Sequence, residues 1–212
     1  MDPFFFAYVT VMLGATLAAM FPGAGFAMVL RNATTVSRKA GIFTALGLSF
    51  GVAFHATIVL FGIAYFVLGN IYIKEAVRLF GAGYLAYSGI TSLLKKSPAL
   101  AVATGGDLHA EDTPFQSFTQ GILTNLFNPK TLIFNLAIFS PFIKTPVSLD
   151  KKLLFVTTYF LIEFVWFTLV STLLTHPRLR SLYESKVIYL VRFSGALLLF
   201  FGIVLFFKDL GV

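Results

Sequence analysis

Residues 118–139 read FTQGILTNLFNPKTLIFNLAIF, and this segment sets the architecture of the whole chain. It is apolar enough to cross a bilayer as a helix, which takes about 20 residues. Its middle nevertheless holds Asn128, Pro129 and Lys130. Asparagine suits a helix N-cap and proline suits the first helical position. We therefore predict one helix that ends near Phe127 and a second helix that starts at Pro129, with free N–H groups and a positive dipole end at the break.

The composition of the chain indicates an integral membrane protein. Its 212 residues are 58% hydrophobic and only 12% charged, with a mean hydropathy of +0.87; a soluble domain carries about 25% charged residues. The apolar start lacks a basic region and a cleavage pattern, so we expect a retained span and not a signal peptide. No cysteine is present, which excludes disulfides and thiolate metal sites. The net charge is +7, and the basic residues that produce it lie between the apolar runs. This position favours contact with lipid head groups over binding of nucleic acid.

The apolar runs predict an all-α membrane protein with six transmembrane helices. They are longer than the strands of a membrane barrel. The predicted spans lie near residues 4–30, 42–68, 72–94, 115–142, 153–175 and 187–207. Residues 95–114, KKSPALAVATGGDLHAEDTP, are rich in glycine, proline and acidic residues and predict a flexible loop.

The two halves, residues 1–94 and 115–212, resemble each other. The pattern V-R-x-x-G-A-x-x-L begins at Val77 and again at Val191, and a proline interrupts the first span of each half, at Pro22 and Pro129. Three spans in each half would place the second half upside down relative to the first. This arrangement, a 3+3 inverted repeat, is common in secondary transporters.

The distribution of basic residues predicts the orientation. Nine lysines and arginines fall in the first, third and fifth loops or beside them, and six fall on the opposite side. Basic residues favour the cytoplasm. We therefore expect the 95–114 loop in the cytoplasm and both termini outside.

The two proline breaks are the first candidate site. In FPGAGF, residues 21–26, Pro22 cannot donate a backbone hydrogen bond, and the segment is expected to unwind or kink there. Two breaks that face each other near the bilayer midplane would form a site for a carboxylate. The alternative is that each proline only kinks a packed helix. The candidate residues are Pro22, Gly23, Ala24, Gly25, Asn125, Asn128, Pro129 and Lys130.

Three ionisable groups lie deep in the apolar runs: Lys130, His55 and Glu163. A charge at the bilayer centre costs about 2.5–3.5 kcal/mol on insertion scales, so Lys130 should face a cavity or a partner, unless it reaches the head groups. Glu163 follows His55 by 108 residues, nearly the offset of the two prolines. A carboxylate and an imidazole at this depth suit a proton relay. The alternative is that Glu163 neutralises Lys130 and that His55 hydrogen-bonds a backbone carbonyl.

No soluble catalytic motif is present, so an enzyme is not expected, and no cofactor is implied. His109, Glu111 and Asp112 in the predicted loop do not make a convincing metal site. The glycines at positions 81, 89, 195 and 202 are expected to allow close contacts between helices.

Four segments in order resemble the LysE/RhtB family of bacterial amino-acid exporters. They are FPGAGFAMVLRN at 21–32, RKAGIFTALGLSFGVAFH at 38–55, GAGYLAYSG at 81–89 and FTQGILTNLFNPKTLIF at 118–134. The resemblance implies efflux of amino acids or related metabolites across the inner membrane, by exchange for protons. It points to Pro22, Gly23, Asn125, Asn128, Pro129 and Lys130. Ala24 departs from the family pattern, which has a second proline at that position.

The sequence therefore predicts a secondary exporter whose partners are an amino acid, protons and membrane lipids, with homodimer formation left open. A passive channel or facilitator on the same scaffold, and a membrane scaffold without transport activity, are the alternatives.

Overall fold

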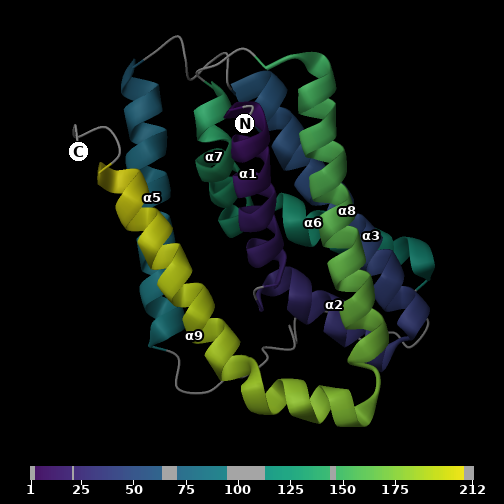
Figure 1. Cartoon of the computed structure of the whole chain (residues 1–212). Coiled ribbons are helices and arrows are strands. Elements are labelled where there is room, and N and C mark those ends of the chain that lie inside the picture. Colours follow the sequence, from purple (N-terminus) through teal and green to yellow (C-terminus); the bar gives the residue numbers. More distant parts are fainter. Residues whose placement is uncertain (1–2, 21, 64–70, 95–112, 144–146, 208–212) are drawn as a thin grey trace.

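The chain folds into a bundle of helices, shown in Figure 1 as a computed structural model that describes residues 3–20, 22–63, 71–94, 113–143 and 147–207. No strand occurs in these residues, so the predicted all-α class is confirmed. The helices are α1 (Pro3–Met20), α2 (Ala24–Thr35), α3 (Arg38–Thr57) with a π-helical continuation η1 (Ile58–Ile63), α5 (Ile71–Leu93), α6 (Pro114–Leu126), α7 (Pro129–Ile143), α8 (Leu149–Leu173) and α9 (Pro177–Phe207).

Three of the described helical segments are long and apolar enough to cross a membrane: Arg38–Gly62, Leu149–Leu173 and Ser185–Phe207. The pair α1 and α2, bent by 51° at the Pro22 break, makes a fourth if it counts as one span. Helix α5 and the pair α6 and α7 coincide with the other two predicted spans. The count of six spans and the inverted repeat remain predictions, as does the 95–114 loop, of which residues 95–112 lie outside the described part.

Local sequence signals explain where the broken segments begin and end. Helix α6 starts with a capping box in which Thr113 and Gln116 exchange hydrogen bonds. It ends at Leu126, and α7 starts at Pro129, as the Asn-Pro pair predicts. In the first half, α1 ends at Met20 and α2 begins after Gly23. Both broken segments are therefore formed by pairs of short helices.

Helix α3 packs against α2, α6 and α8. At Gly47 and Gly121 its contact with α6 is made by backbone, because these glycines place no side chain between the two helices. A Cβ on Gly47 would collide with the carbonyl oxygen of Phe118, and a Cβ on Gly121 would collide with that of Thr44. We call this contact the α3–α6 seam. It holds the segment before the second break firmly against α3.

Helices α5 and α9 form a second closely packed pair at one side of the bundle (Figure 1). A Cβ on Gly89 would lie 2.6 Å from the backbone nitrogen of Leu199, and one on Gly202 would lie 2.8 Å from that of Ala86. Gly195 is equally close to Gly89, so the predicted close contacts are confirmed at these three glycines. At Gly81 a Cβ would meet only ordinary contacts, the nearest at 3.5 Å, and that prediction was wrong.

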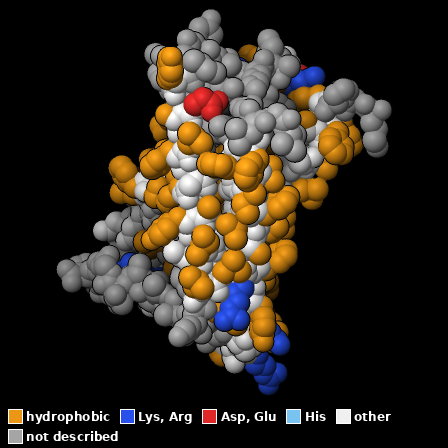
Figure 2. Space-filling view, turned by 90° about the vertical axis from the view of Figure 1, so that its left-hand side faces the viewer, with side chains coloured by type: hydrophobic (Ala, Val, Ile, Leu, Met, Phe, Trp, Pro, Cys, Tyr) orange, Lys and Arg blue, Asp and Glu red, His pale blue; other side chains and the backbone are white. Residues whose placement is uncertain are grey.

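The surface of the bundle fits a membrane protein. Figure 2 shows hydrophobic side chains over the middle of one face and basic side chains toward its lower end. Large apolar residues such as Phe80 and Phe193 are 72% and 57% exposed. In water these side chains would be unfavourably placed, whereas lipid tails accept them at no such cost.

Candidate functional site: a polar pocket between two apolar clusters

Residues of two of the apolar clusters in the interior reach a polar pocket. The first, here named the Tyr159 cluster, consists of Val11, Met12, Ala15, Val52, Ala56, Val59, Leu60, Phe139, Phe155 and Tyr159. The second, the Phe167 cluster, consists of Phe26, Val29, Leu30, Ala45, Leu48, Phe167, Val170 and Leu174. Tyr159 of the first cluster and Phe26, Leu48 and Phe167 of the second line the pocket.

The pocket has a volume of about 60 Å³ and collects residues from both helix breaks. A cavity needs roughly 10–15 Å³ to hold one water molecule, so this pocket has room for a few waters or a small polar group. Its polar lining comes from Asn125, Asn128, Lys130, Thr131, Tyr159 and Glu163. Its other walls are Ala18, Ala19, Gly23, Ala24, Gly25, Phe26, Leu48, Phe134 and Phe167.

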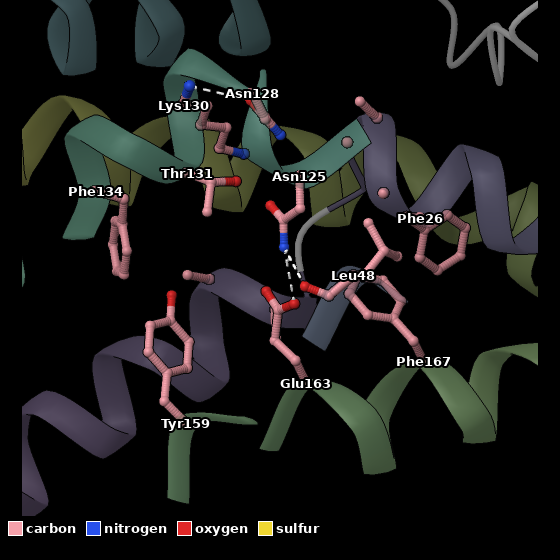
Figure 3. A pocket seen from close by; sticks show the side chains of 15 residues that line it. Phe26, Leu48, Asn125, Asn128, Lys130, Thr131, Phe134, Tyr159, Glu163 and Phe167 are labelled. Atoms are coloured by element: carbon pink, nitrogen blue, oxygen red, sulfur yellow. Dashed lines mark hydrogen bonds between the residues drawn. The ribbon is translucent and has the colours of Figure 1, made fainter. Parts of the chain in front are cut away.

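A buried carboxylate forms the floor of the pocket. Glu163, on α8, is 7% exposed and accepts a hydrogen bond from Nδ2 of Asn125 at 3.2 Å (Figure 3). The same Nδ2 donates to the carbonyl oxygen of Leu48 at 2.7 Å. Gly51 makes room for Asn125, since a Cβ there would lie 2.7 Å from the Asn125 Cβ. The amide is thus fixed by α3 and points its donor at the carboxylate.

The second break presents the start of α7 to the pocket. Oδ1 of Asn128 accepts a hydrogen bond from the backbone N–H of Lys130 at 3.0 Å, as an N-cap does (Figure 3). Lys130 and the following Thr131 are half-buried and line the pocket. Pro129 occupies the first helical position, is exposed, and is not part of the lining. The positive end of the α7 dipole therefore lies across the pocket from Glu163.

The first break presents the start of α2, but without a side-chain cap. Gly23 occupies the N-cap position in extended backbone and, having no side chain, makes no side-chain cap hydrogen bond. Gly23, Ala24 and Gly25 line the pocket, whereas Pro22 is half-buried and does not. Both breaks thus meet at one pocket, as the sequence predicts, but their prolines stay outside it.

The two deep ionisable groups predicted to act together are placed differently. Glu163 lines the pocket, whereas His55 does not. Nε2 of His55 lies 3.2 Å from the carbonyl oxygen of Leu126, which is the backbone partner named as the alternative. The Glu163 side chain contacts the Asn125 amide.

Several lining residues were not singled out from the sequence. Tyr159 and Phe167 flank Glu163 at four residues on either side, so they share its face of α8. This spacing of four residues could have identified both as neighbours of Glu163 from the sequence. Phe26, Leu48 and Phe134 carry no such signal, because the chain has 26 phenylalanines and many leucines.

The described residues hold no group of three His, Asp or Glu side chains close enough to bind a metal ion. His109, Glu111 and Asp112, considered above as ligands, lie outside the described part of the chain.

Comparison with known proteins gives a consistent result. The profile of the LysE type translocator family matches residues 16–209. The chain is 31% identical over 199 residues to a threonine efflux protein of Escherichia coli (strain K12), covering 92% of this chain and 95% of that protein. It is 27% identical over 209 residues to YahN, an uncharacterized membrane protein of the same strain, with 98% and 92% covered. YrhP, an uncharacterized membrane protein of Bacillus subtilis (strain 168), is 26% identical over 205 residues, with 93% and 95% covered. No solved structure matches the chain.

Proposed function

The chain belongs to the LysE type translocator family, and from this premise we propose that it exports an amino acid or a closely related small metabolite across the inner membrane in exchange for protons. The observation that carries the proposal is the pocket in which both helix breaks face the buried Glu163 carboxylate. It offers negative charge on one side and positive charge on the other, which suits a zwitterion.

The two ends of the cargo would bind opposite walls. We place its carboxylate at the start of α7, beside Asn128 and Lys130 and opposite Gly23–Gly25, because helix N-termini attract anions. Its ammonium would meet Glu163, which Asn125 holds in position. The 60 Å³ volume supports a small cargo or a pocket that is closed in this conformation.

The apolar clusters supply the two barriers that an alternating-access carrier needs. The Tyr159 cluster reaches the pocket at Tyr159, and the Phe167 cluster reaches it at Phe26, Leu48 and Phe167. In this proposal the six spans form a 3+3 inverted repeat with both termini outside, and rocking one repeat against the other separates one cluster at a time.

Proton exchange is assigned to Glu163, with His55 as a second candidate. Glu163 lies in the pocket, where a proton and the cargo ammonium would compete for the same carboxylate. His55 contacts the backbone carbonyl of Leu126, just before the second break. It would therefore act on that break and not on the cargo.

Transport into proteoliposomes tests the proposal. The purified protein is reconstituted, a panel of labelled amino acids is offered with threonine first because of the relative's name, and uptake is measured with and without an imposed pH gradient. We expect uptake of at least one amino acid, accelerated by the gradient. Equal uptake in both conditions would favour a facilitator. No uptake of any amino acid, with the protein folded, would favour a scaffold and overturn the proposal.

A further inference from the structure

The first two turns of α9 are set apart from the rest of that helix. Residues 177–184 run across the lower end of the bundle in Figure 1 before the helix turns upward. The apolar span of α9 begins only at Ser185. This segment, here named the crossing segment, therefore lies outside the part of α9 that crosses the membrane.

The crossing segment has the composition of a helix that lies in a membrane interface. Leu179 and Leu182 are 40% and 59% exposed although they are apolar. Arg178 is exposed beside them, and Lys186 is exposed one turn further along. Exposed leucines with basic neighbours are typical of helices that bind anionic lipid surfaces. Glu184 is the only acidic residue between positions 171 and 194, so positive charge dominates this end.

The side chain of Tyr183, also in the crossing segment, points inward to the wall of the pocket. The ring of Tyr183 stacks on that of Phe26, with 4.9 Å between the ring centres and 21° between the planes. Phe26 is 1% exposed and lines the pocket. Tyr183 is therefore an outer layer of the wall of which Phe26 is the inner layer.

The stack is held by contact with a neighbour and not by hydrogen bonds. The Tyr183 hydroxyl is buried without a hydrogen-bond partner among the described residues. Such a hydroxyl opposes burial. The exposed leucines and basic residues of the segment are the groups that an adjacent surface would contact and that could add to the ring packing.

We propose that the crossing segment binds an anionic membrane surface, and that this binding keeps Tyr183 on Phe26 and so closes the pocket wall at this end. The partner is the lipid bilayer itself, recognised by charge through Arg178 in the segment and Lys186 in the first turn after it, and by insertion of Leu179 and Leu182. In a neutral bilayer the electrostatic attraction between the basic residues and the lipid is lost. The contact of the segment with α2, through Tyr183 and Phe26, is then weaker. The inference does not depend on which solute occupies the pocket.

A fluorescence experiment tests this without any transport measurement. The chain has one tryptophan, Trp166, and it is half-buried in α8. A double variant, Trp166→Phe with Tyr183→Trp, moves the fluorophore to the stack. The protein is reconstituted in phosphatidylcholine vesicles with or without phosphatidylglycerol. Quenching by acrylamide, which is uncharged, is then measured in both.

We expect the quenching constant to be at least twofold lower in the anionic vesicles, and about 1 M salt should remove the difference by screening. Adding Arg178→Gln and Lys186→Gln should abolish the lipid dependence. The matched control, Lys151→Gln with Lys152→Gln at the start of α8, makes the same charge change elsewhere and should preserve it. Equal quenching in both vesicles, or a difference that survives the Arg178 and Lys186 changes, would overturn the proposal. The proposed transport function would stand or fall separately.

Discussion

The two helix breaks meet at one pocket but are built differently. At the second break, Asn128 caps α7 and the α3–α6 seam holds the preceding helix by backbone contact. At the first break, Gly23 leaves α2 uncapped, and Gly25 approaches only side chains: a Cβ there would lie 3.1 Å from Cδ2 of Leu48. The difference indicates a fixed side and an adaptable side to the same site.

The seam gives the largest expected effect. Gly121→Ala would place a Cβ against the backbone of Thr44, and backbone cannot turn aside, so we expect it to cost about 3 kcal/mol of stability. Gly25→Ala is the matched control, because its neighbours are flexible side-chain ends, and should cost less than about 1 kcal/mol. Unfolding in mixed micelles, followed by Trp166 fluorescence, compares them. Equal costs would remove the distinction between the two sides.

Glu163 lines the pocket together with residues of both breaks. Replacing its carboxylate tests whether transport at this site depends on that group. Glu163→Gln keeps the shape and a hydrogen-bond acceptor for Asn125 but removes the charge. We expect transport to fall at least about tenfold, equivalent to about 1.4 kcal/mol. Stability should be unchanged or higher, because a buried carboxylate is costly. Asp150→Asn, an exposed position on the same helix, is the control. Full transport by the Glu163 variant would exclude the carboxylate from the mechanism.

The cap at the second break can be removed directly. Asn128→Ala loses the hydrogen bond to the Lys130 N–H and should destabilise the protein by about 1 kcal/mol. Asn128→Ser retains a capping oxygen and should recover most of that loss. Denaturant midpoints of the two variants make the comparison. If alanine and serine behave alike, the cap contributes nothing to stability.

The smallest expected effect comes from adding a cap at the first break. Gly23 has extended backbone that any residue adopts, so Gly23→Ser is tolerated and should gain about 0.3 kcal/mol. The serine hydroxyl would accept a hydrogen bond from a backbone N–H at the start of α2. Because that N–H could then no longer bind the cargo, we expect the KM for the cargo to rise and the maximal rate to stay unchanged. Gly23→Ala adds the carbon without the oxygen and serves as the control. An unchanged KM for the serine variant would show that the α2 donors do not contact cargo.

The positions of both breaks could be predicted from sequence because proline, glycine and asparagine act locally. Asn128 and Pro129 define the start of α7 by hydrogen-bonding capacity alone, and no tertiary information is needed. The same reasoning placed Pro22 and Pro129 in the site, where the structure leaves them out of the lining. A proline marks a break but does not determine which neighbouring side chain faces the cavity.

The rest of the site depends on helix packing, which a single sequence does not specify. The sequence predicts equivalent places for Glu163 and His55 in the two halves, yet of the two only Glu163 lines the pocket. The rotation of each helix decides this, and here it turns His55 toward the Leu126 carbonyl. Phe26 and Leu48 form walls because α2 and α3 converge there, and nothing in their immediate sequence separates them from residues that face lipid.

The apolar clusters that reach the pocket have an electrical consequence. A membrane that stores an ion gradient is an insulator, and any protein within it is a potential leak. Under the proposed mechanism, the cluster side chains that reach the pocket, Tyr159 from one cluster and Phe26, Leu48 and Phe167 from the other, would be the barriers against such a leak. Conductance would require both barriers to part at once, so a carrier that opens one at a time would preserve the voltage across the membrane.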